Sequence, residues 1–157
     1  MFFIFSSCII FLNYTHKTPY KNFEFKTKER EYLVLNSITS WIENNTKKGD
    51  KILIFPEYSM PLLITNRKAD YILYALHDIN IQTLGDEYIK NRILNENYQY
   101  IIDTSLYAST LYCVESYKII NEGKYIETLL KGEFEKYQQI TVSDNTITIY
   151  KKKNTGQ

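Results

Sequence analysis

The chain has 157 residues, of which 44% are hydrophobic and 24% charged; this suffices for one folded domain with a sizeable core and excludes wholesale disorder. Its 19 basic and 18 acidic residues give a formal charge of +1, so the composition gives no reason to expect a nucleic-acid partner. The 15 tyrosines fit either the codon bias of AT-rich coding DNA or an aromatic carbohydrate-binding surface.

Residues 1–12, MFFIFSSCIIFL, form an uncharged apolar segment. The segment is shorter than the roughly 20 apolar residues that cross a bilayer. A signal peptide fits poorly, because no basic residue precedes the run and no small-x-small cleavage site follows it. We interpret this apolar stub as the end of a transmembrane helix, which predicts a membrane-associated protein.

A polar connector is expected over residues 13–28. It contains four lysines, at positions 17, 21, 26 and 28, and such a flank ordinarily indicates the cytoplasmic side under the positive-inside rule. That indication weakens where a large folded domain follows, as it does here. The sequence around the apolar stub therefore does not fix the orientation of the domain.

Residues 29–48 are predicted to form a helix with one apolar face. That face carries Val34, Ile38, Trp41 and Asn45, with Ile42 beside them. Two lysines and a glycine at 47–49 are typical of a helix end. The continuous apolar run 51–55 then predicts a strand buried on both faces, as in a parallel sheet.

A second helix–strand unit follows. Asp86 is a good N-cap for a helix whose apolar face is supplied by Ile89, Ile93 and Leu94. The run 98–102 is the next predicted strand, and it is expected to be a parallel neighbour of the strand 51–55. Between the stronger signals, short helices are expected at about 59–64 and 108–119.

The remaining signals predict a third helix and a hairpin. The helix is expected over 123–136, with four residues inward: Ile126, Leu129, Leu130 and Phe134. A turn at 143–146 between alternating apolar residues predicts a hairpin. Residues 29–152 are therefore expected to form a small α/β domain of Rossmann-like layers, with a mostly parallel sheet and a C-terminal β-hairpin. Residues 153–157 are expected to fray.

Candidate site residues lie where the two predicted parallel strands end. Glu57 and Asp103 follow these strands, Tyr107 lies nearby, and ligands of parallel sheets bind beyond the carboxyl ends of strands. We therefore consider these three residues as substrate-binding candidates. A carboxylate pair there suits acid–base chemistry or the binding of ligand hydroxyls. The alternative is that each carboxylate caps a following helix or turn.

No conventional cofactor site is expected. The five glycines never form a phosphate-binding motif, and Cys8 and Cys113 match no metal-ligand spacing. His77 adjoins Asp78, but neighbours in sequence usually point apart, so no catalytic triad can be assembled. We therefore assign no catalytic residue, no cofactor and no metal ligand.

A series of short segments occurs in a characteristic order. They are the apolar stub, Trp41-Ile42, GDKILIFPE at 49–57, Asn66-Arg67, residues 87–94, YIID at 100–103, EGKY at 122–125, Tyr137, and a hairpin ending at Tyr150-Lys151. In this order, over about residues 12–152, the chain resembles the soluble C-terminal domain of polytopic GT-C type membrane glycosyltransferases, the class of protein mannosyltransferases and arabinosyltransferases.

The resemblance implies an extracytoplasmic domain beside a transmembrane part that uses a polyprenyl-phosphate sugar donor. In these enzymes the catalytic carboxylate lies in a loop between transmembrane helices, and no residue of this chain matches that loop. The chain is thus expected to be a non-catalytic domain or fragment that recognises the donor sugar or a glycan acceptor. Two alternatives remain: a membrane-tethered saccharide- or protein-binding module, and a small enzyme that uses Glu57 and Asp103.

Overall fold

The computed structural model describes residues 16–20, 23–27, 29–56, 60–68, 73, 78–104, 125–143 and 145–153. Within these ranges the chain forms, in order, β1 (His16–Tyr20), β2 (Phe23–Thr27), α1 (Glu29–Asn45), β3 (Ile52–Phe55), α2 (Met60–Ile64), α3 (Asp78–Leu84), α4 (Asp86–Asn95), β4 (Tyr100–Asp103), α6 (Tyr125–Leu129), β5 (Phe134–Val142) and β6 (Asn145–Lys152).

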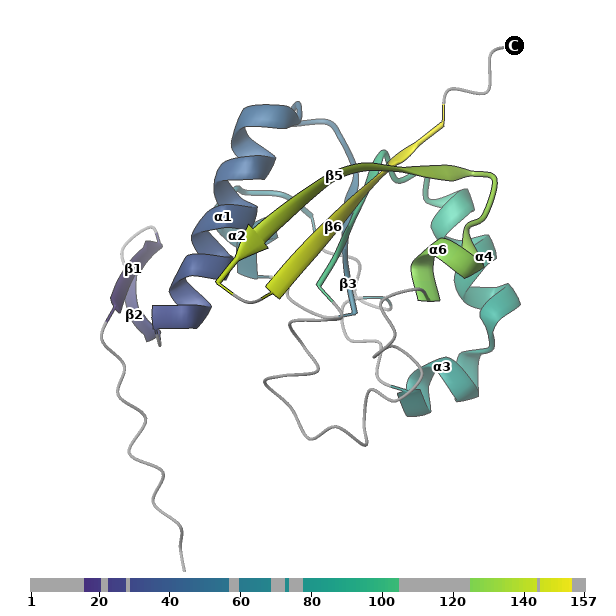
Figure 1. The fold of residues 1–157 in the computed structure, drawn as a ribbon, viewed down its shortest axis with the longest axis horizontal. Coiled ribbons are helices and arrows are strands. Elements are labelled where there is room, and N and C mark those ends of the chain that lie inside the picture. The colour runs from purple at the N-terminus through teal and green to yellow at the C-terminus, as the bar shows by residue number, and fades with distance from the viewer. Residues whose placement is uncertain are drawn as a thin grey trace, which may run out of the picture.

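A central sheet separates two groups of helices (Figure 1). Helices α1 and α2 lie on one side of the sheet, and α3, α4 and α6 lie on the other. Buried side chains form two corresponding clusters, one on each face of the sheet. The α/β class is thus confirmed.

The first cluster lies between the sheet and α1. The predicted apolar face of α1 is confirmed for Val34, Ile38, Trp41 and the adjacent Ile42, which are all buried in this cluster. Asn45, which was also expected on that face, is exposed. The predicted helix of residues 29–48 ends earlier, at Asn45. Arg67 explains part of that end, because its guanidinium donates hydrogen bonds to the carbonyl oxygens of Thr46 and Lys47. Those carbonyls have no further helical turn to accept from.

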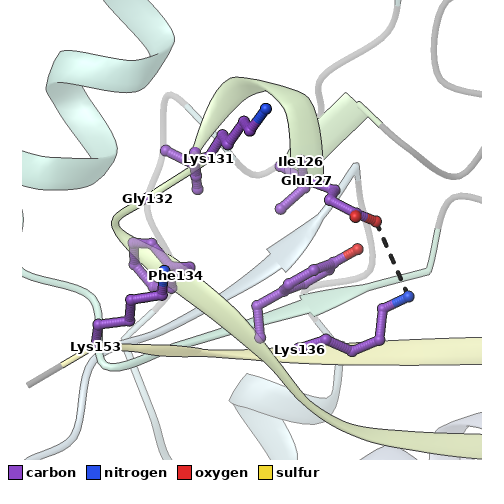
Figure 2. Close-up of a pocket in the computed structure, with 9 residues that line it drawn as sticks. Ile126, Glu127, Lys131, Gly132, Phe134, Lys136 and Lys153 are labelled. Carbon is purple, nitrogen blue, oxygen red and sulfur yellow. Dashed lines mark ion pairs between the residues drawn. The ribbon is translucent and has the colours of Figure 1, made fainter.

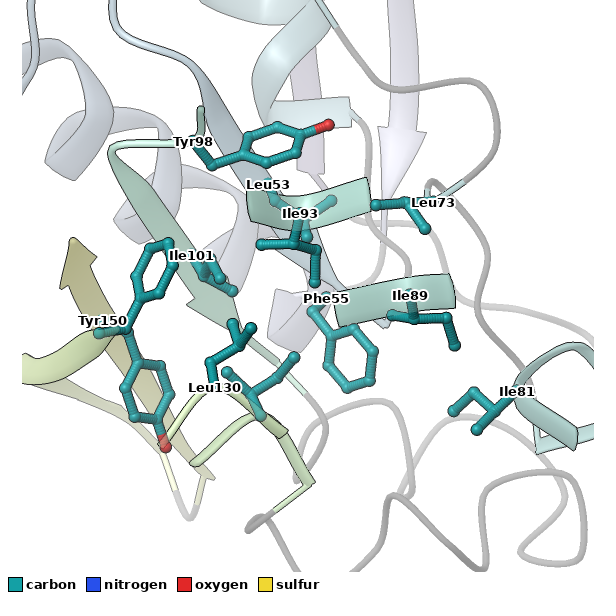
Figure 3. Packing of buried hydrophobic residues seen from close by; sticks show 12 residues of the cluster. Leu53, Phe55, Leu73, Ile81, Ile89, Ile93, Tyr98, Ile101, Leu130 and Tyr150 are labelled. Atoms are coloured by element: carbon teal, nitrogen blue, oxygen red, sulfur yellow. The ribbon is translucent and has the colours of Figure 1, made fainter. Parts of the chain in front are cut away.

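The second cluster lies on the opposite face and joins the sheet to α3, α4 and α6 (Figure 3). Leu53, Phe55 and Ile101 contribute the strand side of this cluster, and Ile89 and Ile93 contribute the face of α4. The expected face of α4 is therefore confirmed. Its expected cap is not, because Asp86 is the first helical residue and Gly85, with a φ of 78°, holds the N-cap position without a side-chain hydrogen bond.

The sheet has the strand order β3-β4-β6-β5. Strands β3 and β4 are parallel neighbours, as predicted, with Leu53 opposite Ile101 and Phe55 opposite Asp103. The other two pairs, β4 with β6 and β5 with β6, are antiparallel. The prediction of a mostly parallel sheet is therefore wrong for the described strands, and a Rossmann-like arrangement is not confirmed.

The third predicted helix is also shorter than expected. Helix α6 covers Tyr125–Leu129, and residues 134–136 belong to β5 instead. Gly132 lies between them with a φ of 98°, a conformation that L side chains rarely adopt. Ile126, Leu130 and Phe134 are buried as expected, whereas Leu129 is half-buried. The predicted terminal hairpin is confirmed as β5 and β6.

A β-bulge in β5 changes which side chains face α1. Lys136 is opposite Tyr150, but Gln138 is opposite Ile149, so Tyr137 is an extra residue in the strand. Gln138 then accepts a hydrogen bond of 2.8 Å from the indole of Trp41. The Tyr137 ring lies on the same face, 6.2 Å from the ring of Tyr100.

The expected polar connector contains β1 and β2, which pair as an antiparallel hairpin. Residues 1–12 and 108–119, for which an apolar helix end and a short helix were expected, lie outside the described residues, as do 154–157 of the expected frayed tail. The short helix expected near 59–64 is present as α2. Within the described ranges, every helix is too short or too polar to traverse a bilayer.

Candidate functional site

The carboxyl ends of β3 and β4 meet at one edge of the sheet. There the backbone N–H and the hydroxyl of Thr104 both donate hydrogen bonds to the carbonyl oxygen of Phe55, at 2.7 and 2.8 Å. Asp103 precedes Thr104 in β4 and is only 4% exposed. These contacts link the two strand ends, and Asp103 beside them is a buried carboxylate.

The structure describes one of the three site residues predicted from the sequence, and their role in substrate binding stays a prediction. Asp103 is the last residue of β4, while Glu57 and Tyr107 lie outside the described residues, as does His77. The convergence of Glu57 and Asp103 in one pocket therefore stays a prediction. Among the described residues, no group of three or more histidine, cysteine, aspartate or glutamate side chains is arranged to hold a metal ion.

Asp103 acts electrostatically on Tyr150 of the neighbouring strand. Tyr150 lies opposite Ile101 and is 3% exposed. Burial raises the pKa of its phenol well above the ordinary value, and the negative charges of Asp103 and Glu127 raise that pKa further. Tyr150 therefore stays protonated at neutral pH, and its hydroxyl is able to donate a hydrogen bond.

Tyr150 also lines a pocket of about 190 Å³, hereafter the α6 pocket (Figure 2). The pocket lies between α6, the turn that follows it, and the strands β5 and β6. Its lining residues are Ile126, Glu127, Leu130, Lys131, Gly132, Phe134, Lys136, Tyr150 and Lys153. Apolar side chains form one part of this wall, and ionisable groups surround the rest.

Helix α6 is held in place by Tyr125 at its first position. The Tyr125 ring stacks on Phe55 with 5.5 Å between ring centroids, and its hydroxyl donates a 2.8 Å hydrogen bond to Asp86 at the start of α4. Burial and the bond to Asp86 raise the pKa of this phenol. The helix that carries one wall of the α6 pocket is therefore fixed to the strand edge and to α4.

The turn after α6 positions the rest of the pocket. The backbone N–H groups of Glu133 and Phe134 both donate to the carbonyl of Leu130, which closes the turn around Gly132. The N–H of Lys153 donates to the carbonyl of Glu133 at 2.9 Å and brings the end of β6 to the same place. Three separate chain segments therefore bring lysines to one opening.

The sequence prediction missed the α6 pocket. A helix extended to residue 136 places Lys131 and Lys136 on helical positions, whereas they belong to a turn and to a strand. Gly132 was the available signal, because glycine is often found where a helix ends and the chain turns. The lysines carry no signal of their own in a chain with 19 basic residues.

Comparisons with protein-family models, curated proteins and solved structures found no match to this chain. The geometry described above and the resemblance of short segments are therefore the basis for a functional proposal.

The Asn66-Arg67 segment, which contributes to that resemblance, has a structural role in the described fold. Asn66 takes a positive φ of 56° after α2, and the Arg67 side chain reaches back to the end of α1. A 2.9 Å hydrogen bond also joins Arg67 to the hydroxyl of Thr46. These contacts account for the segment without a ligand.

Proposed function

We propose that this chain is a non-catalytic extramembrane domain or fragment of a membrane glycosyltransferase that uses lipid-linked sugar donors. In this proposal, residues 1–12 connect it to the membrane, the domain is extracytoplasmic, and it assists recognition of the polyprenyl-phosphate sugar or of a glycan acceptor. The α6 pocket is the observation that carries the recognition role, since it is an opening with both apolar and ionisable lining.

The size of the α6 pocket limits its ligand. Pockets for drug-sized molecules usually measure about 300–1,000 Å³, and this one measures about 190 Å³. A single sugar ring or a phosphate group suits that volume, whereas a whole lipid-linked donor does not. The domain is therefore proposed to hold one part of the substrate while the reaction takes place elsewhere.

The proposal is supported by the arrangement of two segments that carry the resemblance to membrane glycosyltransferases. Residues 49–57 and 100–103 are far apart in sequence, yet they contain the parallel neighbours β3 and β4. Thr104 links their ends through its two hydrogen bonds to Phe55. The two segments therefore contribute to the same sheet edge, which gives a structural reason for them to occur together.

The alternative of a small enzyme requires Asp103 to reach a substrate. With 4% of its surface exposed, Asp103 is better placed to influence Tyr150 than to contact a ligand directly. The alternative of a membrane-tethered binding module shares the α6 pocket with the main proposal. It differs from the main proposal in needing no catalytic partner.

The DNA upstream of Met1 tests the main proposal. We expect an open reading frame, in the same gene or in an adjacent one, that encodes several hydrophobic segments and an extramembrane loop with a carboxylate. An in-frame stop codon next to Met1 together with unrelated neighbouring genes contradicts the glycosyltransferase link. Calorimetric titration of the full chain against a glycan panel then tests the binding module.

A further inference from the structure

Lysines from three chain segments gather at the α6 pocket. Lys131 follows α6, Lys136 lies on β5, and Lys153 follows β6. Figure 2 shows them around the same opening as Glu127. Three cations and one carboxylate therefore line a pocket in a chain whose overall formal charge is only +1. This local excess of positive charge favours an anionic ligand.

The carboxylate of Glu127 forms only a weak ion pair with one of these lysines. Glu127 and Lys136 approach to 3.9 Å, and their side chains are 60% and 49% exposed. Exposed ion pairs with such a separation contribute little, because water competes for both partners. Within the described part of the chain, the ammonium groups of Lys131 and Lys153 have no ion pair or hydrogen bond. These two lysines are available to a ligand.

The remaining lining suits an oxyanion. The Tyr150 hydroxyl stays protonated and adds a neutral donor without repelling an anion. Gly132 leaves open space at the turn, since no heavy atom lies within 4 Å of the position that a Cβ would occupy. Lysine is a common ligand for phosphate, which it binds as a point charge.

We propose that the α6 pocket binds a phosphoryl group, with Lys131 and Lys153 as its principal cationic partners. A phosphate ester presents several acceptor oxygens and at least one negative charge, which the two ammonium groups can share. Glu127, at the rim beside Lys136, disfavours ligands with a larger negative charge. That the phosphoryl group belongs to a sugar phosphate rests on the proposed function.

The test is titration of the full chain, isotopically labelled and held in detergent micelles, with three separate probes: inorganic phosphate, mannose 1-phosphate and mannose. Amide chemical shifts of residues 126–136 and 150–153 report binding at the α6 pocket. We expect both phosphates to shift these resonances and mannose to leave them unchanged. Lys131→Met and Lys153→Met should each weaken phosphate binding about tenfold, the usual scale for one charge-assisted hydrogen bond.

The matched control is Lys48→Met, which removes the same charge from an exposed site after α1. It should leave binding unchanged, and none of the three positions is buried, so folding is preserved. If mannose shifts the pocket resonances as strongly as the phosphates do, or if neither phosphate shifts them, the phosphoryl site is refuted. If inorganic phosphate and mannose 1-phosphate bind equally, the phosphoryl site stands and the sugar-donor role in the proposed function is contradicted.

Discussion

Truncation of Ile101 to alanine should remove a large part of the stability of the domain. Ile101 lies in β4 between Leu53 of β3 and Tyr150 of β6, and its side chain is fully buried. Loss of its buried carbons should lower the free energy of unfolding by roughly 2–5 kcal/mol, because a cavity is left in the centre of the sheet. At about 3 °C per kcal/mol for a chain of this size, Tm should fall by roughly 6–15 °C.

Leu129→Ala is a matched control, since it removes the same number of carbons from a side chain of α6 that packs against the same hydrophobic cluster. Leu129 is only half-buried at the end of α6, so we expect a loss of about 1 kcal/mol. Urea unfolding followed by the fluorescence of Trp41, the chain's single tryptophan, measures both changes. Equal losses in the two variants, or a greater loss for Leu129→Ala, would refute the assignment of Ile101 to the centre of the core.

Two further predictions concern Arg67 and Tyr150. Arg67→Ala removes hydrogen bonds to the end of α1 and should cost about 1–2 kcal/mol in urea unfolding, whereas exposed Lys68→Ala should change little. The pKa of Tyr150 is raised in the folded state, so its contribution to stability is complete below the ordinary value of 10 and is lost as pH rises beyond it. Above pH 10, Tm should therefore fall less steeply with rising pH in Tyr150→Phe than in the unsubstituted chain. An identical fall of Tm in the two chains contradicts the raised pKa of Tyr150.

The sequence was informative where one local signal determined the structure. The runs 52–55 and 100–102 are apolar, and both strands are buried on both faces. Helices α1 and α4 were also predictable, because their apolar residues recur at helical spacing. In each case, tertiary packing and local pattern favour the same structure.

The end of α6 shows why other parts could not be predicted. Phe134 falls on the apolar face of a helix extended from Ile126, yet it begins β5. Strand β5 lies at the edge of the sheet and its middle residues are exposed, so it lacks the alternation that marks a half-buried strand. Strand direction is likewise a tertiary property, since the sequence of β6 does not reveal that it inserts between β4 and β5.

The candidate site was predictable only in part for the same reason. Asp103 was identified because it follows a strong strand signal, although its burial and its effect on Tyr150 depend on β6. The α6 pocket depends on a turn at Gly132 and on the end of β6 reaching Glu133. A short-range sequence pattern does not predict contacts between segments that are far apart in the chain.

The position of β6 has a consequence for synthesis on the ribosome. Although β6 is the last described strand along the chain, it occupies an interior place in the sheet, between β4 and β5. Until it leaves the exit tunnel, β4 has an unpaired edge and Ile101 and Ile102 lack their partners. Such exposed apolar edges invite association with other chains. A nascent chain stalled before residue 145 is therefore expected to need chaperone protection, which a full-length chain can dispense with once β6 has paired.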